Sequence, residues 1–456
     1  MERMVGAGQG PPEHRAIVVV GAGAAGLTTA IACAEECRAR GLEPPPVLLL
    51  EGARRIGAKI LVSGGGRCNV THRAALPDDY HASRPVIRNV LREFSVEDTV
   101  AWFASLGVEL KEEQTGKLFP VTDSARTVVA ALVERAEAVG VEIRTGARVR
   151  EIRGGDGEHA PFRIELEDGE LTCDRLALAT GGRSLPKSGS DGAGYAFARA
   201  LGHTVTDTWP ALVPLVLDPA FPHAEMSGIS HRARLTVRVA GRQVEERTGD
   251  LLWTHFGISG PVAMDISRTW IAAAEAGETP RLELCFTPDF PREAVETELL
   301  ESARRSPVRT IESWLSIELP RRLARWILGR ADLPPRAPIA QIPRAERRRL
   351  LDQLDALPLP VTGPRGWNMA EVTAGGVPLA EIDHRTFASR RRPGLHLVGE
   401  ILDCDGRIGG FNFQWAWAGG HLAGRALARS LPTGPIDARG DGAPADPMED
   451  AGRSRR

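Results

Sequence analysis

A glycine-rich turn directly after a short aliphatic run constrains the fold of this chain more than any other feature. Residues 16–20 read AIVVV, and Gly21-Ala-Gly23-Ala-Ala-Gly26 follows them at the start of an uncharged stretch. In a strand–turn–helix unit, Gly21 allows the tight turn, Gly23 lets a pyrophosphate approach the backbone, and Gly26 lets the helix pack closely on the sheet. The helix start presents free N–H groups and a partial positive charge. The pattern predicts an α/β fold with a nucleotide site.

A second apolar run narrows the choice of nucleotide. Residues 47–51 read VLLLE and end in Glu51. A carboxylate at the tip of this strand can accept hydrogen bonds from both hydroxyls of a ribose, and its charge would repel a 2′-phosphate. The sequence therefore predicts an adenine dinucleotide without a 2′-phosphate, which means FAD or NAD.

Three further segments favour FAD. Residues 57–72 read GAKILVSGGGRCNVTH, where Ser63 to Gly66 let backbone wrap closely around a ligand and where Arg67 and Asn69 add donors. Residues 177–182 read ALATGG, an apolar strand ending in a glycine pair. Residues 395–412 end in Gly-Gly-Phe-Asn at a predicted helix start, an anion site suited to the part of a flavin where negative charge collects on reduction.

Composition excludes several other classes of protein. The 57 basic and 59 acidic residues leave a net charge of −2, so no global field favours nucleic acid or an anionic membrane. Six cysteines without regular spacing do not form a disulfide framework. The uncharged run 16–34 is rich in Gly, Ala and Thr and is better explained as a strand followed by a helix than as a membrane span. We expect a cytoplasmic protein with no membrane association.

The order of segment types predicts a domain interrupted by insertions. Residues 1–15 and 432–456 are polar and rich in Gly and Pro, which is typical of disordered tails. Strand and helix patterns alternate over 16–204 and return over 366–431, so we assign both segments to one cofactor-binding domain. Between them, residues 205–290 are β-rich, with a return near 358–365, and residues 291–357 are helical.

Several motifs, taken together, resemble one family. GAGAAG with Glu51, SGGGRCNVTH, LATGGRSLPKSGSDGAGY, WTHFGISGP, and TAGGVPL with GEILDCDG and GGFNFQWAWAGG are similar to the aminoacetone-oxidase-type FAD flavoproteins, a family also described as related to bile-acid dehydroxylation flavoproteins. The motifs cover residues 16–430 in order, although the helical insert matches no family pattern. The resemblance implies a glutathione-reductase-like FAD-binding (Rossmann) domain that carries an inserted β-barrel-like piece and a helical subdomain.

The resemblance also implies roles for individual residues. Gly21, Gly23, Gly26 and Glu51 would hold the ADP half, and the backbone of Val149 would meet the adenine. Ser63 to Asn69, Gly181, Asp403 and Gly409 to Asn412 would line the ribityl chain and flavin. The full predicted cofactor set is Gly21, Gly23, Ala24, Ala25, Gly26, Glu51, Lys59, Ser63, Gly64, Gly65, Gly66, Arg67, Cys68, Asn69, Val149, Thr180, Gly181, Gly182, Glu400, Asp403, Gly409, Gly410, Phe411 and Asn412.

Two residues are candidates for chemistry beside the flavin. His255, in THFGISGP, is the best candidate general acid, although a turn-capping histidine explains it equally well. Cys68 would lie near the flavin by resemblance, but it has no CxxxxC partner, so disulfide reductase chemistry is not expected and a packing role competes with a catalytic one. The chain lacks CxxC and HxxxH spacing, so we expect no metal site.

These features predict an FAD-dependent oxidoreductase that transfers hydride between the flavin and an organic small molecule. No second GxGxxG follows a strand, so NAD(P)H, if it is the donor, would dock transiently, and O2 is the other possible partner. One alternative is a flavin-dependent reductase of a base in ribosomal RNA, because some similar proteins are thought to modify that RNA and residues 304–349 hold twelve Arg against four acidic residues. Another is a non-catalytic flavin-binding redox sensor. The sequence does not give the oligomeric state.

Overall fold

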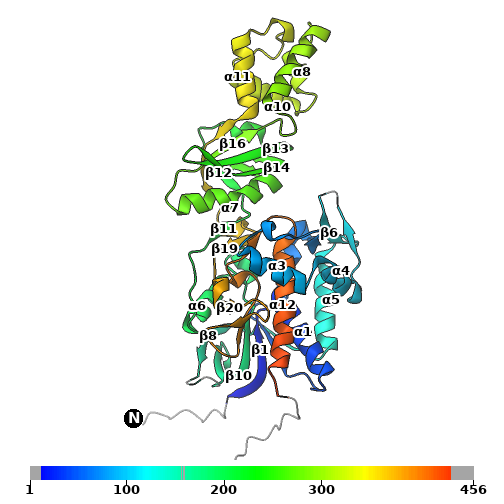
Figure 1. Cartoon of the computed structure of the whole chain (residues 1–456), viewed down its shortest axis with the longest axis vertical. Coiled ribbons are helices and arrows are strands. Elements are labelled where there is room, and N and C mark those ends of the chain that lie inside the picture. Colours follow the sequence, from blue (N-terminus) through cyan, green and yellow to red (C-terminus); the bar gives the residue numbers. More distant parts are fainter. Residues whose placement is uncertain (1–11, 114, 156, 158–159, 433–456) are drawn as a thin grey trace, which may run out of the picture.

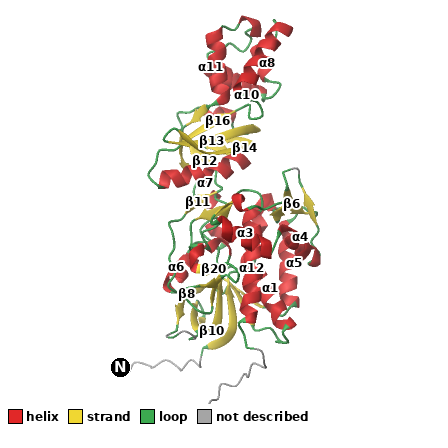
Figure 2. Cartoon of the chain, in the orientation of Figure 1, coloured by secondary structure: helices red, strands yellow, loops and turns green. Residues whose placement is uncertain are grey.

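The computed structural model describes residues 12–432 except 114, 156 and 158–159, so the predicted tails lie almost entirely outside the described residues. Three bodies follow one another along the long axis of the molecule (Figure 1). An α/β body contains both ends of the described chain, an antiparallel sheet follows it, and a group of helices lies farthest away (Figure 2). In the described part of the chain, no helix is both long and apolar enough to cross a membrane.

The α/β body is built on a nine-stranded sheet whose centre is parallel. Its central order is β22 (Leu395–Leu397), β10 (Gly169–Leu178), β1 (Glu13–Val20), β2 (Val47–Glu51) and β7 (Glu142–Thr145). The aliphatic side chains of β1 and β2 are buried, and α1 packs on both strands. The other elements of this body are α2 (Ala58–Val62), β3 (Thr71–His72), β4 (Tyr80–His81), α3 (Arg84–Glu93), α4 (Val96–Ser105), β5 (Leu110–Glu112), β6 (Lys117–Pro120), α5 (Ala125–Ala138), β8 (Val149–Gly154), β9 (Phe162–Leu166), α6 (Ala193–Ala200), β20 (Ile382–Asp383), β21 (Ala388–Ser389) and β23 (Asp405–Gly406).

The first strand begins earlier than its aliphatic residues suggest. Residues 13–15 were predicted to belong to a loose tail, but they form the first part of β1. Glu13 lies opposite Leu171 of β10, in register with the pairs that follow it. The prediction was wrong here because main-chain pairing with a long neighbouring strand can order polar residues that have no apolar side chain to bury.

Two helices from opposite ends of the chain form the closest helix contact of this body. They are α1 (Ala24–Ala39) and α12 (Phe411–Arg429), which run beside each other in Figure 1. Both begin where the sequence predicts a helix start, after the glycine turn and after Gly410. A Cβ on Gly420 would lie 2.7 Å from the Ala25 carbonyl oxygen, and one on Gly424 would lie 2.4 Å from the Thr29 carbonyl oxygen. Glycine is therefore needed at both positions for the two backbones to approach so closely.

The second body is a curved antiparallel sheet of seven strands. Its order is β17 (Leu357–Leu359), β16 (Arg281–Cys285), β13 (Ser230–Val239), β14 (Arg242–Thr254), β15 (Gly257–Ser259), β12 (Leu215–Leu217) and β18 (Val361–Pro364). The two edge strands, β17 and β18, are separated in sequence by Pro360 alone, so the sheet curves until its edges meet at this residue. This is the barrel-like piece that the resemblance implied.

The segment predicted as β-rich also contains a long helix, α7 (Pro261–Glu275). This helix packs on β13 and β14 through Val262, Ala263 and Ile266, which repeat at helical spacing. The third body, α8 (Arg292–Arg305), α9 (Ile311–Leu315), α10 (Arg321–Arg330) and α11 (Arg344–Asp355), shares one hydrophobic core with the curved sheet.

A short two-stranded connection and a group of ion pairs join the inserted bodies to the α/β body. The connection consists of β11 (Trp209–Ala211) and β19 (Val372–Ala374), which pair antiparallel where the chain leaves the α/β body and returns to it. Arg268 of α7 pairs with the buried Asp405 at 3.1 Å, and Arg407 pairs with Asp265 of α7 at 3.0 Å. These contacts hold α7 against the loop before α12, and this loop lines the candidate site.

Candidate functional site: a dinucleotide cavity

One large cavity lies where β1, β2 and β10 end, and it continues to the inserted sheet. Its volume is about 770 Å³, within the range of roughly 300–1,000 Å³ that is usual for ligand and cofactor sites. The walls come from segments that are far apart in sequence. The predicted residues that line the cavity are Gly21, Gly23, Ala24, Ala25, Glu51, Lys59, Ser63, Gly64, Arg67, Asn69, Val149, Thr180, Gly181, Glu400, Gly409, Gly410 and Asn412.

The glycine-rich turn forms one end of the cavity. Gly21 has a φ of +104°, and a Cβ there would lie 2.5 Å from the Ala179 carbonyl oxygen, so the turn tolerates only glycine. A Cβ on Gly23 would meet nothing within 4 Å, which leaves that backbone open to a ligand at the start of α1. A Cβ on Gly26 would lie 1.8 Å from the Gly21 carbonyl oxygen, so this glycine serves the packing of the turn and does not line the cavity.

Glu51 closes the same end of the cavity. Its Oε2 accepts a hydrogen bond from the Ala22 N–H at 2.8 Å, and its Oε1 accepts one from the Ala53 N–H at 2.8 Å. Each carboxylate oxygen has a second lone pair, so the group can still accept hydrogen bonds from a ribose while its negative charge excludes a 2′-phosphate. Nearby, Arg148 and Asp191 form an ion pair at 2.5 Å on the cavity wall.

Two buried polar atoms show that this cavity is built for a polar ligand. Asn69 Oδ1 and Ser190 Oγ are buried and have no hydrogen-bond partner among the described residues. Both residues line the cavity. A buried polar atom without a partner costs roughly 1–3 kcal/mol, so a ligand that supplies partners is favoured. These atoms, the open backbone at Gly23 and the carboxylate of Glu51 together fit an adenine dinucleotide of the FAD type.

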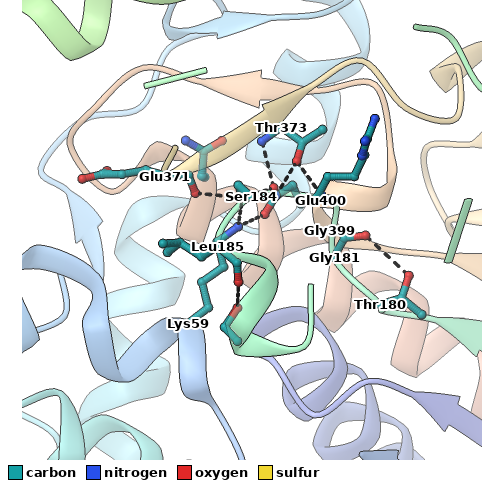
Figure 3. A network of polar contacts seen from close by, with 12 residues as sticks. Lys59, Thr180, Gly181, Ser184, Leu185, Glu371, Thr373, Gly399 and Glu400 are labelled. Atoms are coloured by element: carbon teal, nitrogen blue, oxygen red, sulfur yellow. Dashed lines mark hydrogen bonds and ion pairs between the residues drawn. The ribbon is translucent and has the colours of Figure 1, made fainter. Parts of the chain in front are cut away.

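A polar network crosses the middle of the cavity wall (Figure 3). Lys59 of α2 forms an ion pair with Glu400 and donates to Ser184 Oγ at 2.5 Å. Glu400 Oε1 accepts from the Ser184 hydroxyl at 2.7 Å and from the Thr373 N–H at 2.8 Å. Because these residues come from four separate segments, the network holds Lys59 and Glu400 in place at the cavity surface.

The start of α12 points at the cavity, as the sequence predicted. Gly410 is its N-cap, with a φ of +96°, and a Cβ there would lie 2.6 Å from the Thr71 backbone. Gly409 and Gly410 line the cavity, so the positive end of a 19-residue helix faces it. Asn412 also lines it, but both of its amide atoms are bonded to the Gly406 backbone, where the side chain orders the preceding loop.

Several predicted cofactor residues do not line the cavity. Phe411 is buried and stacks on His72 at a centroid distance of 4.9 Å. Gly182 is close to Thr373 and Glu400, so it makes room for the polar network instead of a ligand. The predicted residues outside the cavity lining are Gly26, Gly65, Gly66, Cys68, Gly182, Asp403 and Phe411. Each is next to a lining residue in the chain, and alternate residues of a turn cannot all face one side.

Cys68 does not have the properties of a catalytic thiol. Its side chain is fully buried, and burial raises the pKa of the thiol to about 12. A nucleophilic cysteine needs an accessible thiolate near neutral pH. The structure therefore supports the packing role and contradicts the catalytic one.

His255 is also far from the expected position. The sequence offered His255 as a general acid beside the flavin, but His255 lies in the turn between β14 and β15, is exposed and does not line the cavity. Ser259, at the other end of β15, does line the cavity. The helix α7 begins two residues later, at Pro261. A hairpin turn and a helix entry occupy opposite ends of this short strand, so the prediction of a general acid at His255 is not supported.

Sequence reasoning missed the far end of the cavity. This end is lined by Leu212, Pro214 and Met264 from the inserted segment, by Asn368, Met369 and Glu371 beside β19, by Lys117 and Phe119 of β6, and by Arg407. The segment TAGGVPL, which begins at Thr373, was the available signal, because Met369 and Glu371 come just before it. Among the described residues there is no group of three or more His, Cys, Asp or Glu side chains that could hold a metal ion.

FAD, when bound, supplies a flavin that accepts or donates a hydride at its ring, and the protein supplies orientation and proton transfer. Glu51, the glycine turn and Ser190 are the residues that would hold the nucleotide part, and Asn69, which lies beside Gly64 and Phe119, would be nearer the flavin. The apolar and charged residues at the far end are left to contact a substrate.

Comparison with known proteins agrees with this geometry. The chain matches the model of the HI0933-like protein Rossmann domain over residues 15–426. It is 34% identical to the 3-dehydro-bile acid delta(4,6)-reductase of Clostridium scindens, over 90% of this chain and 98% of the relative. It is 31% identical to the ribosomal RNA dihydrouridine synthase of Escherichia coli, over 88% of this chain and 95% of that relative.

A solved structure, a 3-ketosteroid-delta4-(5alpha)-dehydrogenase from Rhodococcus jostii, is 15% identical with a TM-score of 0.48, over 91% of this chain and 97% of that chain. The family model spans most of the sequence and contains the glycine turn, Glu51 and the helix start at Gly410. The chain therefore belongs to the HI0933-like Rossmann-domain family of FAD-dependent oxidoreductases, in agreement with the family prediction made from its motifs.

Proposed function

We propose that this protein uses FAD to transfer hydride to or from a carbon–carbon double bond conjugated to a carbonyl group in a hydrophobic, steroid-like small molecule. The observation that carries the proposal is the far end of the cavity. Leu212, Pro214, Met264, Met369 and Phe119 form an apolar surface next to the dinucleotide site. The Clostridium scindens relative, named for the reduction of a bile-acid derivative, supports the same substrate class.

A hydride donor is needed in the reducing direction. We propose NADH or NADPH, docking transiently at the far end before the substrate does, because the sequence has one dinucleotide fingerprint and FAD uses it. In the oxidising direction, O2 could accept the electrons.

The test is a pair of anaerobic half-reactions with the purified, FAD-loaded protein. Flavin bleaching is followed with NADH and with NADPH, and flavin reoxidation is then followed with a panel of steroid enones, small enones and amines. We expect rapid reoxidation by steroid enones and slow reoxidation by small enones, because only the larger molecules fill the apolar end. Equal rates for both groups, or no reoxidation by any enone, would contradict the proposal.

The reduction of a base in ribosomal RNA is the second candidate. The name of the Escherichia coli relative and the twelve Arg residues of 304–349 favour it. The helical body that contains them is more balanced than this segment suggests, since residues 292–355 hold 13 Arg and 10 acidic residues. Several of these Arg residues are in ion pairs, as in Arg321 and Arg325 with Glu312. The exposed Arg residues with neither an ion pair nor a side-chain hydrogen bond among the described residues are Arg304, Arg336, Arg344 and Arg348, whereas Arg322, Arg330 and Arg349 have no ion pair but donate hydrogen bonds.

Salt dependence separates the two candidates. If the helical body binds phosphates, affinity for ribosomal RNA fragments falls with salt with a log–log slope of about −0.7 to −0.9 per phosphate neutralised. Reversing the charge of Arg344 and Arg348 should then flatten the slope without changing FAD content. We expect weak binding at physiological salt and no effect of the double change. A steep slope that the change reduces, together with flavin reoxidation by RNA, would favour the second candidate.

A further inference from the structure

Glu371 occupies a fixed position between the α/β body and the inserted sheet. It comes directly before β19, where the chain returns from the insertion. Its N–H donates to the Leu212 carbonyl oxygen at 3.1 Å, and its carbonyl oxygen lies 3.3 Å from Ser184 Oγ, whose single proton is shared with the nearer Glu400 Oε1 at 2.7 Å. The backbone is therefore held on both sides, once by the connection to the insertion and once by the network that contains Glu400.

The carboxylate of Glu371 has no partner among the described residues, unlike the other carboxylates that line the cavity. Four carboxylates line the cavity. Glu51 accepts two backbone N–H groups, Asp191 pairs with Arg148, and Glu400 pairs with Lys59. Glu371 is exposed to the cavity, and its carboxylate has no hydrogen bond or ion pair to any described residue. Figure 3 shows its side chain directed away from Glu400.

The surroundings of Glu371 favour its protonated form. Although the side chain faces the cavity, the protein encloses it, and this desolvation raises the pKa of the carboxyl above its ordinary value of 4.5. The positive charges of Lys117 and Lys59 act in the opposite direction and do not outweigh the desolvation. The other charged groups that line the cavity away from the nucleotide end are Arg67, Glu400 and Arg407.

We propose that Glu371 is the catalytic acid–base that exchanges a proton with the substrate as hydride is transferred. The assignment rests on the proposed function, because it takes an enone as the substrate. It replaces His255, which the structure places outside the cavity. Glu371 lines the cavity together with Met369 and Leu212, and its N–H donates to the Leu212 carbonyl oxygen, so it lies with the residues that the insertion contributes.

In the reducing direction, one hydride and one proton add across the double bond of the substrate. A hydride from reduced FAD, itself reduced beforehand by a nicotinamide donor, forms a C–H bond at one end of the substrate's conjugated double bond. The π electron pair moves away from that carbon, and the proton that leaves the Glu371 carboxyl forms a C–H bond at the other end. The resulting carboxylate then takes a proton from water. In the oxidising direction, the same carboxylate removes the proton.

The test compares Glu371→Gln, Glu371→Asp and the control Glu225→Gln, which changes an exposed glutamate that does not line the cavity. FAD affinity, the rate of anaerobic flavin reoxidation by a steroid enone, and its dependence on pH are measured for each. An infrared pH titration of the apoprotein, taken as the difference between wild type and Glu371→Gln, reports the protonation of this carboxyl without any turnover.

We expect Glu371→Gln to bind FAD within twofold of wild type and to lose about 100-fold or more in reoxidation rate, the scale of a general acid. The rate of flavin reoxidation by the wild type should fall as pH rises through the raised pKa of Glu371. This fall in rate should be absent from the pH–rate profile of Glu371→Gln. Glu371→Asp should react more slowly than the wild type but should still lose rate as pH rises, because it retains a carboxyl group. The infrared difference should show a carboxyl that titrates above pH 4.5.

Contrary outcomes are distinct. Suppose that enones reoxidise the flavin of the wild type, and that they reoxidise the flavin of Glu371→Gln equally fast or with the same dependence on pH. This result would overturn the role of Glu371 and leave the proposed function intact. Loss of FAD from both Glu371 variants would show that the residue serves cofactor binding, and would also overturn the role. Wild type that reacts with no enone would overturn the proposed function and this inference together.

Discussion

Replacing Glu51 by glutamine tests the nucleotide end of the site most directly. The carboxylate accepts two backbone N–H groups, from Ala22 and Ala53, both at 2.8 Å. In Glu51→Gln one of the two oxygens becomes an NH2 group, which faces an N–H that it cannot bond. One charge-assisted hydrogen bond is lost, and such bonds contribute about 1.5–3 kcal/mol each. This loss lowers the stability of the apoprotein itself, because the donor and the acceptor of the hydrogen bond are both in the protein chain.

The effect on the cofactor is separate. The glutamine keeps the shape of the side chain but loses the charge that strengthens hydrogen bonds from ribose hydroxyls. A loss of about 1–2 kcal/mol corresponds to a rise in the Kd for FAD of roughly 5- to 30-fold. Urea unfolding of the apoprotein measures the first effect, and quenching of flavin fluorescence on titration of the apoprotein with FAD measures the second, with Glu225→Gln as control. Reduced apoprotein stability with an unchanged Kd would refute the assignment of Glu51 to the ribose.

Three further outcomes are expected. Gly424→Ala should lower the free energy of unfolding, measured with urea, by about 1–3 kcal/mol, because its Cβ would lie 2.4 Å from the Thr29 carbonyl oxygen. Gly329→Ala, at an open position of α10, should instead raise the free energy of unfolding by about 0.5–1 kcal/mol. Desolvation raises the pKa of Glu381, but hydrogen bonds from Thr204, Arg391 and His203 outweigh it and lower the pKa from 4.5 to about 2. The stability that Glu381 contributes is therefore fully present above pH 4.5 and lost as pH falls towards 2, so acid unfolding of Glu381→Gln should depend less on pH in that window. Cys68→Ala should retain FAD and turnover within a few-fold of wild type, and mass spectrometry after iodoacetamide treatment at pH 8 should find Cys68 unmodified, since its pKa is about 12; rapid alkylation would contradict its burial.

The nucleotide end of the site could be read from the sequence because it is encoded locally. The glycine turn, the strand that precedes it and the helix that follows lie within consecutive residues, so their order alone forms a recognisable pattern. The structure gives Gly21 and Gly26 steric reasons, a clash with Ala179 and with Gly21 respectively, and leaves Gly23 open to a ligand. The same holds for the start of α12 at Phe411, which the Gly-Gly-Phe-Asn segment predicted. Glu51 was found because the end of a parallel strand and a carboxylate together form a recognisable pattern.

The substrate end was decided only by tertiary structure. Glu371, Met264 and Lys117 come from segments more than 100 residues apart, and they meet because α7 is held against the loop before α12 by ion pairs such as Arg268 with Asp405. No local pattern encodes which faces of two bodies will come together. His255 shows the same limit, since its distance from the cavity depends on the register of a hairpin in the inserted sheet. The sequence by itself therefore determined the cofactor class and the family, whereas the packing of the insertion determined which side chains face the substrate.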